Sequence, residues 1–373
     1  MLSGKKIIVF YITERSGHHS AALALKRGFE VSDPSVSVKC VNAFRYLFPI
    51  AERVTHRVYL FVIKRIPAVW RFLYDRPSFV KRSAGLKGWI HRLSFNKLSR
   101  LLNEVAPQAV LCTQAFPCGV LSAYKRERGG SFKIYGILTD FAPHSFWVYD
   151  EVDAYVVASD KTREWLVQKG VSPEKVHVFG IPVDPKFSKQ TDKTEVRVKY
   201  GLDKDIPAAL IMGGGHGLGP IRQIIKRLDE CEVPLQMMVV CGLNRKLYRW
   251  LASQTFKKRI LVFKYTDEID QLMSAAHLVI TKPGGITTAE ALAKGLPMII
   301  LNPIPGQEAR NTEFLVDAEA ALSAQTVDDV VPAVRCVVTR MLAAGGSLTG
   351  STGRSLARPA SSRDIAVFVL NSL

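Results

Sequence analysis

One segment, residues 278–301, constrains the fold of this chain more than any other. Leu278–Thr281 is a short apolar run that fits a buried parallel strand, and Gly284 and Gly285 then form a turn. A helical period follows, and Met298–Leu301 reads as a second buried strand. Two parallel strands joined in this way need a crossover helix between them. The segment therefore predicts an α/β domain with a parallel sheet.

The same alternation of apolar strands and helices extends along the whole chain. It predicts the α/β class, with one doubly wound parallel sheet in each half. The predicted strands of the first half are Lys6–Ile12, Val36–Val41, Ala109–Cys112, Lys133–Thr139, Ala154–Ala158 and Val176–Phe179. Those of the second half are Ala208–Met212, Gln236–Cys241, Ile260–Phe263, Leu278–Thr281, Met298–Leu301 and Ala321–Ser323.

The chain of 373 residues is long enough for two domains of ordinary size. Residues 181–196 are polar, contain prolines and lack periodicity, so we predict a linker there. We predict a Rossmann-like domain over residues 1–185, a second over 186–355 and a terminal helix over 356–373 that docks on the first domain. The two domains are expected to face a cleft.

The turn at Gly284 and Gly285 is a predicted phosphate seat. A helix start carries unpaired N–H groups and a partial positive charge, both of which favour an anion. Thr287 and Thr288 are expected to cap this helix. Gly-rich turns are common in doubly wound domains, so this turn alone does not indicate a ligand site. The residues that follow it provide the further support.

Three polar residues follow the turn in a consistent order. Glu290 lies about one turn into the helix, within reach of a sugar diol next to the phosphate. Gln307 and Glu308 come after the next strand, where a second sugar could be bound. A solvated role is the ordinary alternative for each residue alone. Their order and spacing together are typical of a nucleotide-sugar site.

A second glycine turn, residues 213–220, has five glycines in seven positions after a strand. Such a turn allows close approach of the backbone to a ligand, and pyrophosphate is the natural candidate. A dinucleotide cofactor is the rival, but the next strand ends without the acid that would bind a ribose. No P-loop motif occurs in the chain.

Two further groups follow strands of the first half. After the first strand, a helix is predicted to open at Ala21. His18 comes just before it, at the helix N-terminus, where a neutral imidazole is favoured, and His19 follows it. Asp140 and His144 follow the strand at 133–139, where a carboxylate and an imidazole could share one proton transfer. A capping or packing role is the alternative for each.

The net charge of +18 calls for an anionic partner. Residues 44–100 mix thirteen Lys or Arg with bulky aromatics and hold two acids, which suits an anionic lipid surface. The residues that we single out for acceptor or membrane contact are Arg57, Tyr59, Arg65, Trp70 and Arg71. A basic flap packed on its own domain is the alternative, and no nucleic-acid partner is expected.

Six scattered cysteines without a C-x-x-C pair indicate reduced thiols and no zinc site. No apolar run approaches the roughly 20 residues that span a bilayer. We therefore expect a cytoplasmic protein that binds the inner face of the membrane peripherally.

These segments together resemble the family of processive diacylglycerol glucosyltransferases and monogalactosyldiacylglycerol synthases, which are related to MurG-type enzymes. The resemblance rests on RSGHHSAA (15–22), on residues 136–159, on GGGHGLGP (213–220), and on TKPGGITTAEALAKGLP with NPIPGQEARN (281–311). It spans nearly the whole chain in the expected order. It implies two Rossmann-like domains of the GT-B type, with the acceptor on the first and the donor on the second.

The resemblance also implies an activity and roles for residues. A UDP-sugar would glycosylate a lipid hydroxyl with inversion, and diacylglycerol or a related glycolipid would be the acceptor. The residues around the diphosphate would be Gly214, Gly215, Gly217, Gly284 and Gly285. Glu290 would hold the ribose, and Gln307 and Glu308 the donor sugar. His18 and Asp140 would be candidates for the base, with His144 beside them.

No metal or other cofactor is expected, because glycine turns and helix starts can stabilise the charge on departing UDP. Several alternatives stay open at this point. The same fold could act on a polyprenyl-linked sugar or epimerise a UDP-sugar. A protein of another class, which binds membranes or nucleic acid without turnover, would share the basic charge.

Overall fold

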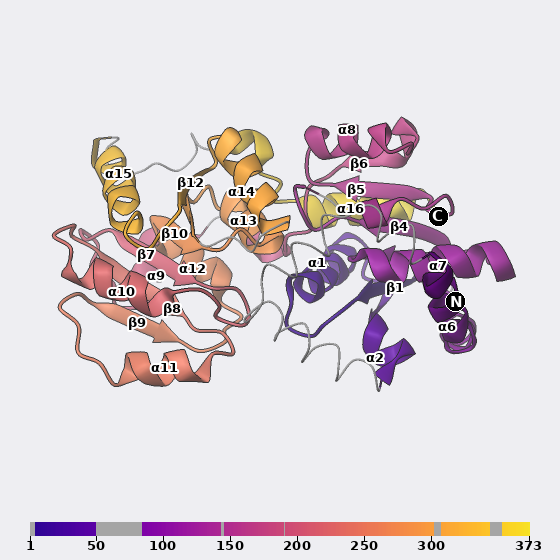
Figure 1. Ribbon diagram of the computed structural model, residues 1–373, viewed down its shortest axis with the longest axis horizontal. Helices are drawn as coiled ribbons and strands as arrows, with labels where there is room; N and C mark the ends of the chain where they lie inside the picture. Colours follow the sequence, from indigo (N-terminus) through magenta and orange to yellow (C-terminus); the bar gives the residue numbers. More distant parts are fainter. Residues whose placement is uncertain (1–3, 50–83, 143–144, 190, 302–306, 344–352) are drawn as a thin grey trace. The chain divides into compact units, whose positions relative to one another are not determined.

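The computed structural model describes residues 4–49, 84–142, 145–189, 191–301, 307–343 and 353–373 (Figure 1). The chain forms two compact units. The first comprises Met1–Pro185, Ile304–Gln307 and Ala360–Leu373, and the second comprises Lys186–Pro303 and Glu308–Pro359. Each unit is built on one six-stranded sheet whose strands all pair in parallel.

The sheet of the first unit has the order β2-β1-β3-β4-β5-β6. Its strands are β1 (Lys6–Tyr11), β2 (Ser37–Asn42), β3 (Ala109–Cys112), β4 (Lys133–Ile137), β5 (Ala154–Val157) and β6 (Val176–Val178). Its helices are α1 (Gly17–Ser32), α2 (Ala43–Leu47), α6 (Ala84–Val105), α7 (Ala115–Arg128), α8 (Asp160–Gln168) and α16 (Ser361–Asn371).

The sheet of the second unit has the order β12-β11-β10-β7-β8-β9. Its strands are β7 (Ala208–Met212), β8 (Gln236–Val240), β9 (Ile260–Phe263), β10 (Leu278–Thr281), β11 (Met298–Leu301) and β12 (Ala321–Ala324). Its helices are α9 (Lys193–Lys199), α10 (Ile221–Glu230), α11 (Arg245–Ala252), α12 (Ile269–Ala275), α13 (Gly285–Ala293), α14 (Gln307–Asp317) and α15 (Val330–Ala343). All the predicted strands are present in the two sheets, so the predicted α/β class is confirmed.

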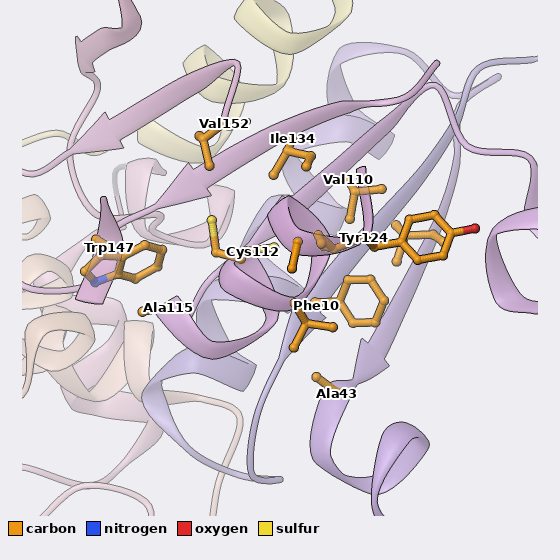
Figure 2. Packing of buried hydrophobic residues seen from close by; sticks show 14 of the residues in the cluster. Phe10, Ala43, Val110, Cys112, Ala115, Tyr124, Ile134, Trp147 and Val152 are labelled. Atoms are coloured by element: carbon orange, nitrogen blue, oxygen red, sulfur yellow. The ribbon is translucent and has the colours of Figure 1, made fainter. Parts of the chain in front are cut away.

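Burial on both faces explains why β1, β3 and β5 of the first sheet are almost continuously apolar. In β1, Ile8 and Phe10 belong to the cluster on one face, whereas Ile7 and Val9 belong to the cluster on the other. Figure 2 shows the first cluster, in which Phe10 lies with Tyr124 of α7. A strand covered on both faces has no polar positions, which is why alternation is missing from these runs.

The terminal helix α16 packs on α1 in the first unit (Figure 1). Ile365 and Val369 of α16 are fully buried in the same cluster as Leu25 of α1. Polar contacts fix the end of the helix, where the Tyr135 hydroxyl lies 2.5 Å from Ser372 Oγ. The buried face of α16 is thus part of the core around the first sheet. No helix in the described part of the chain is long and apolar enough to cross a membrane.

Truncation of a buried residue of α16 should destabilise the first unit. Ile365 is 0% exposed, whereas Val367 on the same helix is 42% exposed. We expect Ile365→Ala to lower the free energy of unfolding by about 2–5 kcal/mol, because it leaves a cavity in the core. Val367→Ala should change it by less than about 0.5 kcal/mol. Urea unfolding measures both, and equal losses would show that α16 is not part of this core.

Candidate functional site

The first candidate site lies at the carboxyl ends of β1, β3 and β4. In the order β2-β1-β3-β4, the chain runs from β1 to β2 on one side and from β3 to β4 on the other side. The direction of the strand order therefore reverses between β1 and β3, which makes this a topological switch point. Ligands of α/β sheets bind outside the strand ends at such points. His18, in the first turn of α1, lies here with Thr113, which follows β3, and Thr139, which follows β4.

His18 is held by contacts from two strand ends. Its Nδ1 lies 2.8 Å from the Thr113 carbonyl oxygen and 3.1 Å from Thr139 Oγ1. Because a carbonyl oxygen can only accept, Nδ1 carries the proton and Nε2 keeps its lone pair. Burial lowers the pKa of His18 to about 4, although the bond to Thr113 opposes this shift. The imidazole is therefore neutral at pH 7 and able to accept a proton at Nε2.

His19 is placed differently. Its ring stacks on Tyr11 with centroids 4.5 Å apart, and its Nδ1 accepts a hydrogen bond from the Arg15 backbone N–H at 3.1 Å. Nε2 then carries the proton, 3.6 Å from a Glu14 carboxylate oxygen. Both ring nitrogens are thus engaged within the loop after β1. Each histidine has one ring nitrogen without a proton. That of His19 already accepts a hydrogen bond, whereas Nε2 of His18 makes no hydrogen bond to the described residues.

The predicted start of the first helix at Ala21 was wrong, because α1 begins at Gly17. Ser16 is the N-cap, and its hydroxyl accepts a hydrogen bond from the His19 N–H at 3.3 Å. The serine satisfies one of the unpaired N–H groups of the helix start, so the helix can begin four residues earlier. Both histidines consequently lie on the helix rather than in the loop before it.

Asp140 follows β4 and is partly exposed. Its neighbour Thr139 contacts His18, so the backbone brings Asp140 to the same edge of the first sheet. His144, the third predicted member of this group, lies outside the described residues. The roles of all three residues in proton transfer stay predictions.

The second candidate site lies at the carboxyl ends of β7 and β10, which are neighbours at the switch point of the second sheet. The glycine turn after β7 packs tightly on the turn after β8. A Cβ at Gly217 would overlap the Cys241 carbonyl oxygen, and one at Gly242 would overlap that of Gly215. Only glycine lets these two backbones approach so closely. The turn is thus held rigidly at the switch point.

Two helices begin beside this turn without a side-chain cap. Pro220 is the N-cap of α10 and Gly284 is that of α13, and neither makes a side-chain capping bond. The prediction that Thr287 and Thr288 cap the second helix was therefore wrong. Because α13 already begins at Gly285, both threonines lie inside it, and the Thr288 hydroxyl donates back to the Gly284 carbonyl at 3.0 Å.

The space at Gly284 suits a ligand. Among the described residues, no heavy atom beyond its chain neighbours lies within 4 Å of the position that a Cβ at Gly284 would take. An uncapped helix start with open space beside it can accept phosphate oxygens from backbone N–H groups. Gly214, Gly215, Gly217, Gly284 and Gly285 are brought to one edge of the sheet, as the predicted diphosphate seat requires.

Lys282 is a residue of this site that the sequence did not single out. It directly follows β10, and its Cε would lie 3.1 Å from a Cβ at Gly214, so the side chain passes over the glycine turn. Its ammonium lies 2.5 Å from a Glu308 carboxylate oxygen. The side chains of Lys282 and Glu308 are 26% and 14% exposed, so the pair is only partly screened by water. A cation therefore lies at the predicted diphosphate seat.

Glu290 lies on α13 in a charged surrounding. An ion pair of Lys186 and Asp270, 3.3 Å between Nζ and Oδ1, is close enough to influence it. Burial raises the pKa of Glu290 to about 8, and Asp270 adds to the shift while Lys186 opposes it. The carboxyl group is thus mainly protonated at pH 7, and it can donate as well as accept a hydrogen bond.

The remaining predicted residues are not placed by the structure. The side chain of Gln307 lies outside the described part of the chain, although α14 begins at this residue. The five acceptor or membrane residues also lie outside it, namely Arg57, Tyr59, Arg65, Trp70 and Arg71. Their roles stay predictions.

Comparison with known proteins identifies the class of both units. The family model for monogalactosyldiacylglycerol synthase matches residues 18–183, and that for the glycosyltransferase family 28 C-terminal domain matches residues 208–329. The fold is shared with Acinetobacter baumannii MurG, at a TM-score of 0.63 and 16% identity over 99% of this chain and 100% of that one. These matches and the two Rossmann-like units define a glycosyltransferase of the GT-B type.

One group of relatives narrows the class further. The processive diacylglycerol β-glucosyltransferase of Bacillus pumilus is 31% identical over 347 residues, which cover 90% of this chain and 87% of the relative. The chain belongs to the family of these glucosyltransferases and the monogalactosyldiacylglycerol synthases, and the resemblance found in the sequence is confirmed. The fold occurs outside this family as well. The UDP-GlcNAc 2-epimerase of Neisseria meningitidis, bound to UDP-GlcNAc, shares it at a TM-score of 0.58 and 14% identity, over 98% of this chain and 100% of that one.

The chain contains one Asp-x-Asp triplet, Asp203–Asp205, of the kind that can bridge a metal ion to a diphosphate. It lies before β7, at the amino end of the strand, whereas the glycine turn follows the carboxyl end. The backbone carbonyl oxygen of Asp203 accepts hydrogen bonds from Arg197 and Gln236. The triplet is therefore at the opposite end of the strand from the predicted diphosphate seat.

The raised pKa of Glu290 makes stability depend on pH. An unfolded chain loses this proton near pH 4.5 and the folded protein near pH 8, so the folded state binds more protons between these values. Glu290 therefore lowers stability as the pH rises through that window. We expect Glu290→Gln to match the wild type near pH 5 and to exceed its melting temperature by several degrees at pH 9. A difference between the two proteins that does not change with pH, measured by calorimetry, would contradict a protonated Glu290.

Proposed function

We propose that the protein is an inverting glycosyltransferase that moves a hexose from a UDP-sugar to diacylglycerol or a related glycolipid at a membrane surface. The observation that carries the proposal is the anion seat of the second unit. There Lys282 passes over Gly214 beside two uncapped helix starts. The acceptor is inferred from the printed names of the Bacillus relatives and of the matching synthase family. The nucleotide donor is inferred from the UDP-GlcNAc bound by a structural relative.

The chemistry asks for a base on the acceptor side. In the proposed step, Nε2 of His18 takes the proton of the lipid hydroxyl as its oxygen attacks the anomeric carbon. The bond from that carbon to the UDP oxygen breaks, and UDP leaves with the electron pair. Asp140, near His18, would stabilise the imidazolium that forms, or act as the base in its place. A single displacement of this kind inverts the anomeric centre.

Departing UDP gains negative charge as the bond breaks. Backbone N–H groups at the starts of α10 and α13 and the ammonium of Lys282 would stabilise that charge. The proposal includes no metal or other cofactor. Glu290 would bind the ribose diol, and Gln307 and Glu308 the hexose. Thr287, in the first turn of α13, would lie close to the diphosphate.

The proposed place of the reaction is the inner face of the membrane, with the protein bound peripherally. Diacylglycerol, the acceptor named for the relatives, is a membrane lipid, and a basic aromatic segment over residues 44–100 suits an anionic surface. A UDP-release assay with several UDP-sugars and diacylglycerol in anionic vesicles tests the function. Glycosylation of a polyprenyl-linked sugar instead, or conversion of the UDP-sugar without any acceptor, would replace it by one of the two same-fold alternatives.

The two histidines provide a matched test of the base. We expect His18→Ala to lower turnover about 100-fold or more, and Asp140→Ala to have an effect of similar size. His19→Ala should cost less than about tenfold, because that ring is engaged within its own loop. Since the pKa of His18 is near 4, the wild-type kcat/KM should stay level from pH 8 down to about pH 5.5. Full activity of His18→Ala in the UDP-release assay would remove His18 as the base.

Lys282 should bind the phosphates and not the nucleoside. A charge-assisted hydrogen bond contributes about 1.5–3 kcal/mol, so Lys282→Met should weaken UDP binding by about 10- to 100-fold. The affinity for uridine, which lacks phosphate, should change by less than about twofold. Lys204→Met, an exposed lysine before β7, serves as the control and should leave both affinities unchanged. Titration calorimetry measures them, and equal weakening of UDP and uridine would show that Lys282 acts on the fold of the site.

A further inference from the structure

The second unit carries a basic aromatic surface that belongs to neither candidate site. Residues 241–266 contain seven Lys or Arg and no Asp or Glu. They form α11 and β9, the edge strand of the second sheet. In Figure 1 these two elements lie next to α10. The charge of this segment is therefore concentrated on one part of the second unit.

Contacts between cations and rings join α10 and α11 into one surface. The Arg222 guanidinium lies 5.1 Å from the centre of the Trp250 ring, and the Lys226 ammonium lies 6.0 Å from it. Arg222 also donates a hydrogen bond to the Lys246 carbonyl oxygen at 3.2 Å. We define the α10–α11 face by Arg222, Lys226, Lys246, Arg249, Trp250 and Lys264.

The charges of this face point to solvent. Leu247 and Leu251 of α11 are each 3% exposed and pack into the core, while Lys246 and Arg249 are exposed. Some cations elsewhere on the unit are paired, as Lys199 is with Glu268 at 2.6 Å. Within the described residues, no carboxylate lies within salt-bridge distance of the cations of the α10–α11 face. The α10–α11 face thus consists of exposed cations that surround Trp250 and form no salt bridge within the described residues.

We propose that the α10–α11 face docks on an anionic lipid bilayer and gives the second unit a membrane contact of its own. Exposed cations are attracted to the negative surface potential, and tryptophan is favoured at the level of the headgroups. The choice of a bilayer as the partner rests on the proposed function, in which the acceptor is a membrane lipid.

The aromatic rings argue against nucleic acid as the partner. A protein that binds single strands offers open aromatic faces on which bases stack. Here Arg222 and Lys226 lie over the Trp250 ring, and the Lys264 ammonium lies 5.0 Å from the centre of the Tyr248 ring. Because cations of the chain already occupy these rings, they are poorly placed to stack on bases.

The test compares two charge reversals in the full-length chain. Lys246→Glu with Arg249→Glu removes cations from the face, and Arg335→Glu with Arg340→Glu makes the same change in charge on exposed positions of α15. We expect the first variant to bind vesicles with 30% phosphatidylglycerol about tenfold or more weakly than the wild type at physiological salt, and the control to lose less than about threefold. The difference should disappear near 1 M salt, where surface charges are screened. Both variants should keep the wild-type affinity for UDP, which shows that the second unit is folded.

Equal losses in the two variants would overturn the proposal, because they would reflect net charge alone. So would a face variant that binds vesicles like the wild type. Loss of binding to an oligouridylate, with vesicle binding unchanged, would identify the face as a nucleic-acid surface instead. The two proposals can be contradicted independently. If the wild type releases no UDP in the presence of diacylglycerol while the face variant still loses vesicle binding, the proposed function is wrong and the membrane contact stands.

Discussion

Parallel pairing of strands that are buried on both faces is the constraint on which both units depend. Strands covered on both faces carry mainly apolar side chains, so the polar residues that could bind a ligand lie at the ends of the strands. Since all the carboxyl ends of a parallel sheet lie along one edge, residues far apart in the sequence meet there. His18 and Thr139 meet in this way in the first unit, and Lys282 and Gly214 in the second. Both meetings occur at the switch point of a sheet.

The strands could be predicted from the sequence because their signal is local. An apolar run of four to six residues bounded by glycine or proline has few other interpretations in a chain that alternates so regularly. Helix starts were predicted less well, since α1 begins at Gly17 and α13 at Gly285, each ahead of its predicted start. A helix can begin at any residue whose N–H groups find a partner or are left open to a ligand. That choice depends on the surroundings of the turn.

The site residues also divide into those that a local sequence pattern predicts and those that only the folded surroundings reveal. The glycine turns were visible in the sequence, because runs of glycine beside a strand have a direct backbone meaning. Lys282 was not, because its long side chain gains a role only through its ion pair with Glu308, 26 residues away, and through its position over Gly214. His18 was preferred as the candidate base, although no local signal in the sequence separates it from the adjacent His19. Thr113 and Tyr11, which come from different strands, separate them in the structure.

The protonation of Glu290 bears on how a carboxyl group could work close to a diphosphate. An ionised carboxylate there would repel the phosphates, whereas a protonated one adds no charge. Burial keeps Glu290 mainly protonated at pH 7, and the neighbouring Asp270 acts in the same direction. In the proposed role, the acid could donate one hydrogen bond to the ribose diol and accept another. The positive charge of Lys282 and of the helix starts then remains for the diphosphate, where the negative charge of the leaving group develops.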